Sequence, residues 1–172
     1  MLPITTSLTA ILPVIRQKLI DDEILQGTRI NFTVEEDWPH LSAQQDILLK
    51  VRTEKRHGNF QMGSGRYDVR VKRTLQVILR TRKLSDKVGS DYKLLNDTAV
   101  GVIAIEDSII ESLEDFIPVD ANGNMLTFEG LEFSDISEPQ KAKAQKDWTS
   151  SSVNFTIPYR RAVTTTLYAE GG

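Results

Sequence analysis

Apolar residues near the start of the chain recur at helical spacing, with polar residues on the opposite side. They predict an amphipathic helix over about residues 7–25, with Gly27 as its stop signal. Pro13 lies inside this range, and proline removes one backbone hydrogen bond from a helix. Either the regular part therefore starts near Leu12, with Pro13 in its first turn, or the helix is kinked at this point.

A second apolar face of helical spacing lies in the acidic part of the chain. Its positions are Val102, Ile105, Ile109, Leu113 and Phe116. Asn96 or Asp97 is the expected N-cap, and Pro118 is expected to end the helix. The side away from the apolar face carries acids, namely Glu106, Asp107, Glu111, Glu114 and Asp115. This pattern predicts a second amphipathic helix with a negatively charged outer side.

Alternation of apolar and polar residues predicts strands at residues 29–34, 47–52, 69–80, 125–133 and 151–159. The second and third strands form the strongest pair, with one apolar face and one largely basic face. Residues 55–68 between them are rich in glycine and polar groups, and loops of such length are usually functional or mobile. Pro158 is expected to place the end of the last strand at a sheet edge, because proline lacks a ladder N–H.

This order of elements predicts an α+β fold, with a mostly antiparallel sheet of four to five strands and two helices packed on one face. The chain has 172 residues, of which 40% are hydrophobic, and this suits one domain with its own core. We expect a single domain over residues 1–163, with an extended hairpin loop near 54–68. Residues 164–172 show no clear pattern and are expected to form a C-terminal arm or a disordered tail.

Charge is sorted along the chain. Residues 50–87 carry twelve Lys or Arg against three Asp or Glu, whereas residues 97–138 carry eleven Asp or Glu and no Lys or Arg. The formal net charge of −3 therefore hides two surfaces of opposite sign. Either they face each other within one monomer as a lattice of salt bridges, or they meet between copies in a heterologous contact.

Residue types that carry enzyme or cofactor chemistry are sparse. The absence of Cys excludes disulfides and thiolate chemistry, and the two His residues make a His-based metal site improbable. The two glycines of residues 63–66 do not form a P-loop, because no Lys-Ser/Thr pair and helix follow them. Glu111 and Asp115 share a helix face, but nothing else converges on them as a cation site. We expect no enzyme, no cofactor and no metal.

Membrane insertion is not expected, because no apolar run approaches the roughly 20 residues that span a bilayer. The N-terminus also lacks a basic leader ahead of its apolar part, so a soluble intracellular protein is expected.

The basic strand positions share one parity and would project from one face of the paired strands. They are Lys50, Arg52, Arg70, Lys72, Arg80 and Arg82. Two interpretations remain open for this strip. It is either a solvated sheet face that pairs with acidic neighbours, or a surface that binds nucleic-acid phosphates without base specificity.

Four segments carry a resemblance to tail terminator proteins of long-tailed bacteriophages, also called tail completion or tail-to-head joining proteins. They are the opening helix TAILPVIRQKLIDD, the basic strand VRVKRTLQVILRTR, the helix GVIAIEDSIIESLEDF and the closing strand WTSSSVNFTIPYRRAV. The similarity covers most of the chain in order and spacing, through diffuse motifs with no diagnostic signature.

The resemblance implies a structural virion protein that forms a ring, typically a hexamer, on the tail tube. Such a ring stops tube polymerisation and offers a surface to the head or neck connector. The implied partners are therefore other copies of the chain, the tail tube protein and the connector protein. In this family DNA passes through the ring lumen without specific binding, and assembly takes place in the host cytoplasm.

The charge separation and the resemblance together give candidate site residues. The expected subunit interface comprises Lys50, Arg52, Arg70, Lys72, Arg73, Glu106, Glu111, Glu114 and Asp115. The expected loop that contacts a partner or lines the lumen comprises Lys55, Arg56, His57, Phe60 and Arg66. The alternative function is a non-specific nucleic-acid-binding module that uses the basic strip of residues 50–87.

Overall fold

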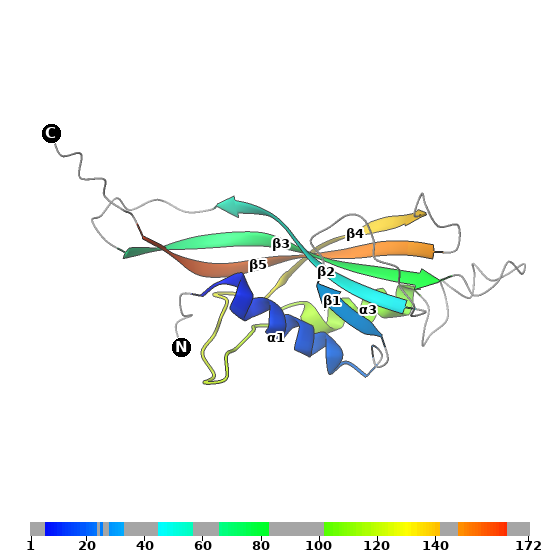
Figure 1. The fold of residues 1–172 in the computed structure, drawn as a ribbon, viewed down its shortest axis with the longest axis horizontal. Helices are drawn as coiled ribbons and strands as arrows, with labels where there is room; N and C mark the ends of the chain where they lie inside the picture. The colour runs from blue at the N-terminus through cyan, green and yellow to red at the C-terminus, as the bar shows by residue number, and fades with distance from the viewer. Residues whose placement is uncertain are drawn as a thin grey trace, which may run out of the picture.

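The computed structural model describes residues 6–23, 25, 28–32, 45–56, 66–82, 102–141 and 148–164. Its elements are α1 (Leu8–Ile20), β1 (Arg29–Phe32), β2 (Gln45–Arg56), β3 (Arg66–Arg82), α3 (Val102–Leu113), β4 (Glu132–Lys141) and β5 (Trp148–Thr164). The strands form one five-stranded sheet in the order β1-β2-β3-β5-β4. β1 pairs with β2 in parallel, and the other neighbours are antiparallel. Both helices cover the same face of the sheet (Figure 1), so the predicted α+β class is confirmed.

The core lies between this helix layer and the central strands. Leu75 of β3 stands opposite Phe155 of β5, and Val77 stands opposite Val153. Successive residues of a strand point to opposite faces, so these odd-numbered positions all face the helices. The helices contribute Ile11, Ile15, Leu19, Ile105, Ile109 and Leu113, and each of these side chains is at most 1% exposed. Burial of this apolar surface is the main favourable term in the folding of the chain.

The first helix differs from the expectation at both ends. α1 begins at Leu8, so Pro13 lies inside it and not in its first turn, and it ends at Ile20 instead of near residue 25. Asp22 then joins the two helices, because its carboxylate accepts hydrogen bonds from the hydroxyls of Ser108 and Ser112 on α3. This contact fixes the end of α1 against the second half of α3.

The second helix ends earlier than predicted. α3 stops at Leu113, five residues before Pro118, and the expected N-caps Asn96 and Asp97 lie outside the described residues. The cause is visible at Asp115, whose φ of 59° is left-handed and therefore cannot continue a right-handed helix. The Asp115 N–H donates to the carbonyl of Leu131 instead, at 2.9 Å.

The predicted strand over residues 125–133 is wrong for most of its length. Residues 114–131 form a long loop that folds back on itself, held by hydrogen bonds from Leu131 N to Phe116 O and from Leu126 N to Pro118 O. β4 starts at Glu132 and continues to Lys141. Gly130 allows the chain to close on itself, since a Cβ there would lie 2.6 Å from the backbone of Asp115.

The central strands are longer than predicted. β2 continues to Arg56 and β3 starts at Arg66, so strand structure extends into both ends of the segment expected to be a loop. β3 and β5 pair over 17 residues each. The Pro158 carbonyl points away from β3 and accepts a hydrogen bond from Phe128 N. In an antiparallel strand the N and the carbonyl of one residue point to the same side, so the N–H that proline lacks would not have bonded to β3. Pro158 therefore lies at an edge, as predicted.

Candidate functional site

Basic residues gather where the ends of three strands lie side by side. We call this region the basic arm and define it as residues 50–56 of β2, 66–73 of β3 and 157–164 of β5, which are joined by the register of the sheet. These segments carry ten Lys or Arg and two Asp or Glu. β3 and β5 continue beyond α1 in this direction (Figure 1). The strand ends thus carry a strong positive charge past part of the helix layer.

The arrangement of charge on the arm is unfavourable for the sheet itself. Arg70 of β3 stands directly opposite Arg160 of β5, and like charges in this position destabilise a strand pair by roughly 0.2–1 kcal/mol. Arg70 is exposed, and its guanidinium lies over the ring of Phe128, 5.2 Å from the centroid. Sheet stability therefore does not account for the cluster of positive charge.

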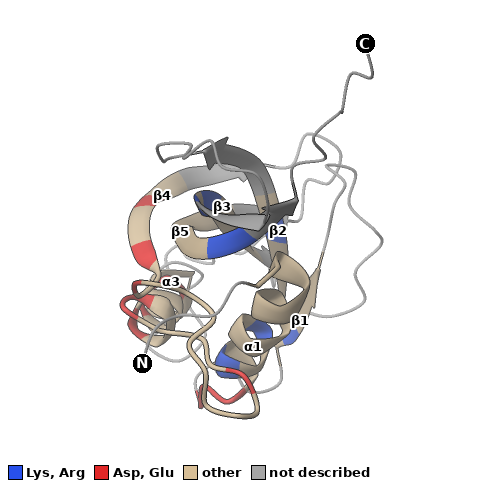
Figure 2. Ribbon diagram, turned by 90° about the vertical axis from the view of Figure 1, so that its left-hand side faces the viewer, with Lys and Arg blue, Asp and Glu red and all other residues tan. Residues whose placement is uncertain are grey.

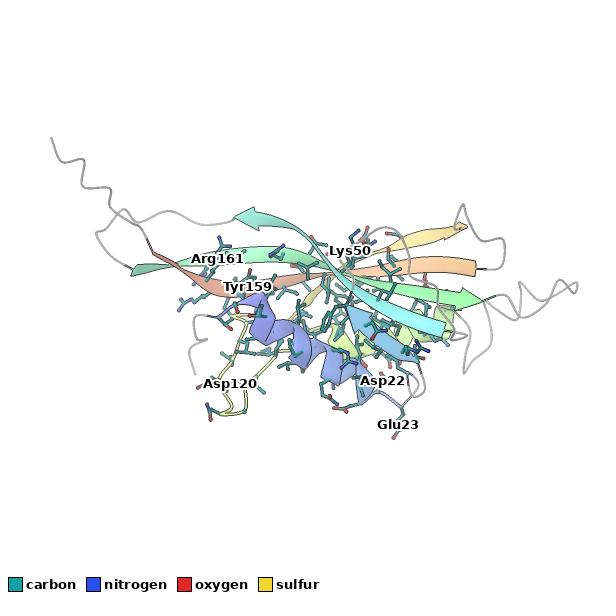
Figure 3. The ribbon with its side chains drawn as sticks, viewed as in Figure 1. Asp22, Glu23, Lys50, Asp120, Tyr159 and Arg161 are labelled. Atoms are coloured by element: carbon teal, nitrogen blue, oxygen red, sulfur yellow. The ribbon has the colours of Figure 1, made fainter. Side chains whose placement is uncertain are left out.

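Arg73 occupies a different position from the other predicted interface cations. Its side chain points to the same face of β3 as Val71 and Leu75, the face that carries the helices, and it is half-buried. Lys72 and Arg70 lie on the opposite face of β3. Figure 3 likewise shows Lys50 on the side of the sheet away from the helices.

Glu106 was expected on the outer side of α3, and this placement is wrong. Its side chain is 8% exposed and packs on the sheet side of the helix, whereas the neighbouring Asp107 is exposed. Burial raises the pKa of Glu106 above its ordinary value, the Ser151 hydroxyl opposes this shift, and the charge of Asp107 reinforces it. Ser151 Oγ is close enough to act on the carboxylate electrostatically but forms no hydrogen bond of normal geometry. Glu106 therefore offers no exposed charge to a partner.

The remaining predicted acids are exposed but do not all lie on the helix. Glu111 is on α3, while Glu114 and Asp115 follow its end, so Glu111 and Asp115 do not share a helix face. Within the described part of the chain these three carboxylates form no ion pair. Figure 2 shows Lys and Arg of the central strands over the middle of the sheet, and Asp and Glu along β4, α3 and the loop after α3. The two charged surfaces thus do not form a salt-bridge lattice between their described residues.

The loop that follows α3 is acidic and well fixed. We call residues 114–132 the acidic loop, that is, the loop together with Glu132, the first residue of β4; it carries five Asp or Glu and no Lys or Arg. At its tip, Asp120 accepts hydrogen bonds from the N–H groups of Asn122 and Asn124, at 2.9 and 2.8 Å. A further bond from the Asn124 side chain makes the largest contribution to a pKa of Asp120 below its ordinary value. The carboxylate therefore holds the turn together, far from the sheet (Figure 3).

One side of the acidic loop is buried and the other is apolar and exposed. Leu126 and Leu131 are at most 2% exposed and belong to the core. Ile117 and Val119, on either side of the buried Pro118, are 39% and 45% exposed. Exposed apolar patches that are rimmed by polar residues commonly mark an interaction site.

Several predicted site residues remain predictions. His57 and Phe60 lie outside the described residues, and for Arg52, Lys55, Arg56 and Arg66 the structure describes strand position but not the side chain. The structure also brings to the arm two residues that the sequence did not nominate, Arg160 and Arg161. They are distant in sequence from the basic stretch, so only the pairing of β3 with β5 reveals them. Ile117 was missed because it falls within the range expected to be helix, and Val119 because it lies between the expected helix end at Pro118 and the next expected strand.

The described residues contain no group of three or more His, Cys, Asp or Glu placed to hold a metal ion. In the same part of the chain, no helix is both long and apolar enough to cross a membrane.

Comparison with known proteins finds a likeness in structure but not in sequence. No protein-family model and no curated protein matches the chain. Among solved structures, the fold is similar to a chain in the virion of a native gene transfer agent particle, with a TM-score of 0.52 and 18% sequence identity. The similarity covers 89% of this chain and 96% of that chain. The likeness therefore extends over nearly the whole of both chains, and what it establishes is a shared fold.

Proposed function

We propose that this protein is a non-enzymatic structural subunit of a phage-like virion, and that it acts at the end of the tail tube. There it assembles as a ring, stops tube polymerisation and joins the tube to the head or neck connector. The observation that carries this proposal is the fold shared, over 89% of this chain, with a chain of a gene transfer agent virion. The ring is expected to be a hexamer, with DNA passing through its lumen without specific binding.

The separation of charge supports assembly between copies. A ring of identical subunits uses heterologous contacts, in which one surface of a subunit meets a different surface of the next. The proposed basic side comprises Lys50, Arg52, Arg70 and Lys72, with Arg73 of β3 on the opposite face of the sheet, and the proposed acidic side comprises Glu111, Glu114 and Asp115. Those three carboxylates have no ion-pair partner within the described part of the subunit and so are available to a neighbour.

The direct test is electron microscopy of polymerising tail-tube protein in the presence and absence of the purified chain. The proposal expects shorter tubes with a ring at one end, and a ring diameter that matches the tube. Tubes of unchanged length without end density would contradict it.

Nucleic-acid binding is the second candidate, and the Arg70–Arg160 pair is the observation that favours it, since phosphate groups would relieve the repulsion. A gel-shift titration separates the two candidates. A phosphate-binding surface would retain duplex DNA and lose about tenfold or more in affinity over a few-fold rise in salt. The tail-end proposal expects no shift at physiological salt.

A further inference from the structure

The acidic loop combines three properties that suit it to binding a partner. It is fixed by its own hydrogen bonds, it carries five Asp or Glu and no Lys or Arg of its own, and it exposes apolar side chains. Glu114, Glu129 and Glu132 are all exposed, and none forms an ion pair within the described part of the chain. Ile117 and Val119 lie on the same loop, 39% and 45% exposed.

The loop is shaped before any partner arrives. Bonds of 2.8 to 3.0 Å link Asp115, Phe116 and Pro118 to the returning chain, and Leu126 and Leu131 anchor that chain in the core. A preformed loop loses little conformational freedom on docking, so more of its contact energy appears as affinity. The loop is therefore better suited to docking than a segment that must fold on binding.

The basic arm has the complementary chemistry. Arg70, Lys72 and Arg160 carry long aliphatic stems with a cationic end. Such stems can cover exposed Ile and Val side chains while the cationic ends reach surrounding carboxylates. Docking would also place negative charge between Arg70 and Arg160, whose mutual repulsion the sheet otherwise has to tolerate.

We infer that the acidic loop of one copy docks on the basic arm of a second copy, with Ile117 and Val119 against the stems of the arm residues. This inference rests on the proposed ring assembly and names its contact surfaces. Inside a subunit, Phe128 of the loop contacts the arm through its ring, which lies under the Arg70 guanidinium, and through its N–H, which donates to the Pro158 carbonyl, and neither contact uses a carboxylate. Each copy therefore presents both surfaces, and repetition of the contact builds an oligomer.

Sedimentation equilibrium of charge-reversed variants at about 50 mM salt tests the contact, because screening is weak at that ionic strength. One variant reverses the loop, Glu129→Lys with Glu132→Lys, and another reverses the arm, Arg70→Glu with Arg160→Glu. Each is expected to weaken self-association about tenfold or more, since like charges then face each other. Circular dichroism melts check that both variants remain folded.

Mixing the two charge-reversed variants tests the contact more sharply than either variant alone. The loop variant and the arm variant are each expected to stay monomeric alone, yet an equimolar mixture restores association, because every contact again pairs opposite charges. The matched control reverses two exposed acids elsewhere, Asp21→Lys with Glu23→Lys, and is expected to associate within about twofold of the wild type. Replacing Ile117 and Val119 by Ser tests the apolar part and is expected to weaken association, whereas Ile103→Ser is not.

Three outcomes would overturn the inference: a wild-type chain that stays monomeric at millimolar concentration, reversed variants that associate normally, or a mixture that does not recover. These outcomes are distinct from failure of the proposed function. If the wild type caps tubes but the loop variant associates normally, the docking surface is wrong and the virion role stands. If the mixture recovers but the wild type never affects tube length, the contact is right and the tail-end role is wrong.

Discussion

The strand pair β3 and β5 has two halves that share one hydrogen-bonded ladder and differ in almost everything else. In one half, Leu75 stands opposite Phe155 beneath the helices, and both side chains are fully buried. Five residues along β3, Arg70 stands opposite Arg160 at the part of the ladder that leads beyond α1. The first half supplies apolar burial, and the second carries a cost in repulsion. A continuous strand pair can therefore stabilise the fold at one end and present a binding surface at the other.

The largest effect is expected in the buried half. Phe155→Ala removes a ring that is 0% exposed and packs edge-on against Phe133, with ring centroids 6.0 Å apart. Large-to-small changes of this kind cost about 3–5 kcal/mol, because they lose apolar burial and leave a cavity. Urea denaturation followed by circular dichroism measures the loss. A change below about 1 kcal/mol would mean that the helices do not cover this half tightly.

The next largest loss of stability is expected in the acidic loop, which is proposed to contact a second copy. Gly130→Ala would bring a Cβ to 2.6 Å from the Asp115 backbone, so the loop must shift, at roughly 1–3 kcal/mol. The matched control is Gly123→Asn, since nothing lies within 4 Å of that position and Asn tolerates the left-handed φ of 80°. Thermal melts compare the two variants. Equal melting temperatures would show that the close approach does not shape the loop.

A pH series sharpens the contrast between buried and exposed charge. Burial raises the pKa of Glu106 above its ordinary 4.5, so the folded chain binds this proton more tightly than the unfolded chain. The associated stability is present at low pH and is lost as the pH rises from 4.5 through the folded-state pKa. Glu106→Gln should therefore gain stability relative to the wild type as the pH rises. A difference that stays constant with pH would contradict a raised pKa.

The smallest expected effect is that of a change at Arg160, which should stabilise the monomer but weaken its self-association. Arg160→Ser removes one member of the like-charged pair, so the monomer should gain roughly 0.2–1 kcal/mol. Self-association should weaken in the same variant, because the arm loses a cation. Denaturation and sedimentation on one preparation measure both. A variant that loses monomer stability would place Arg160 among the residues that support the fold.

The sequence predicted the parts of the fold whose pattern comes from burial. The helical spacing of Ile11, Ile15 and Leu19 and the alternation of Leu75, Val77 and Leu79 both reflect a single covered face, so element type followed directly. β4 was missed because SDISEP is polar and contains Pro139, features that an edge strand tolerates.

The candidate site was harder to predict from the sequence than the fold, for a physical reason. Leu126, Phe128 and Leu131 resemble a strand pattern, but their segment is fixed by hydrogen bonds to the chain after α3, which no local pattern encodes. Glu106 is a charged residue, so the sequence predicted it on the exposed side of the helix, whereas its side chain is buried. Arg160 lies beside the basic residues of β3 only because β3 pairs with β5, a strand far from it in sequence.

Contact between the acidic loop of one copy and the basic arm of another is best tested by the association constant of the wild-type chain as a function of salt concentration. If two oppositely charged surfaces meet between copies, association should fall about tenfold or more between roughly 50 and 500 mM NaCl as the charges are screened. The free energy of unfolding of the monomer, which depends on apolar burial, should change little over this range. Association that is unaffected by salt, or strengthened by it, would contradict the account.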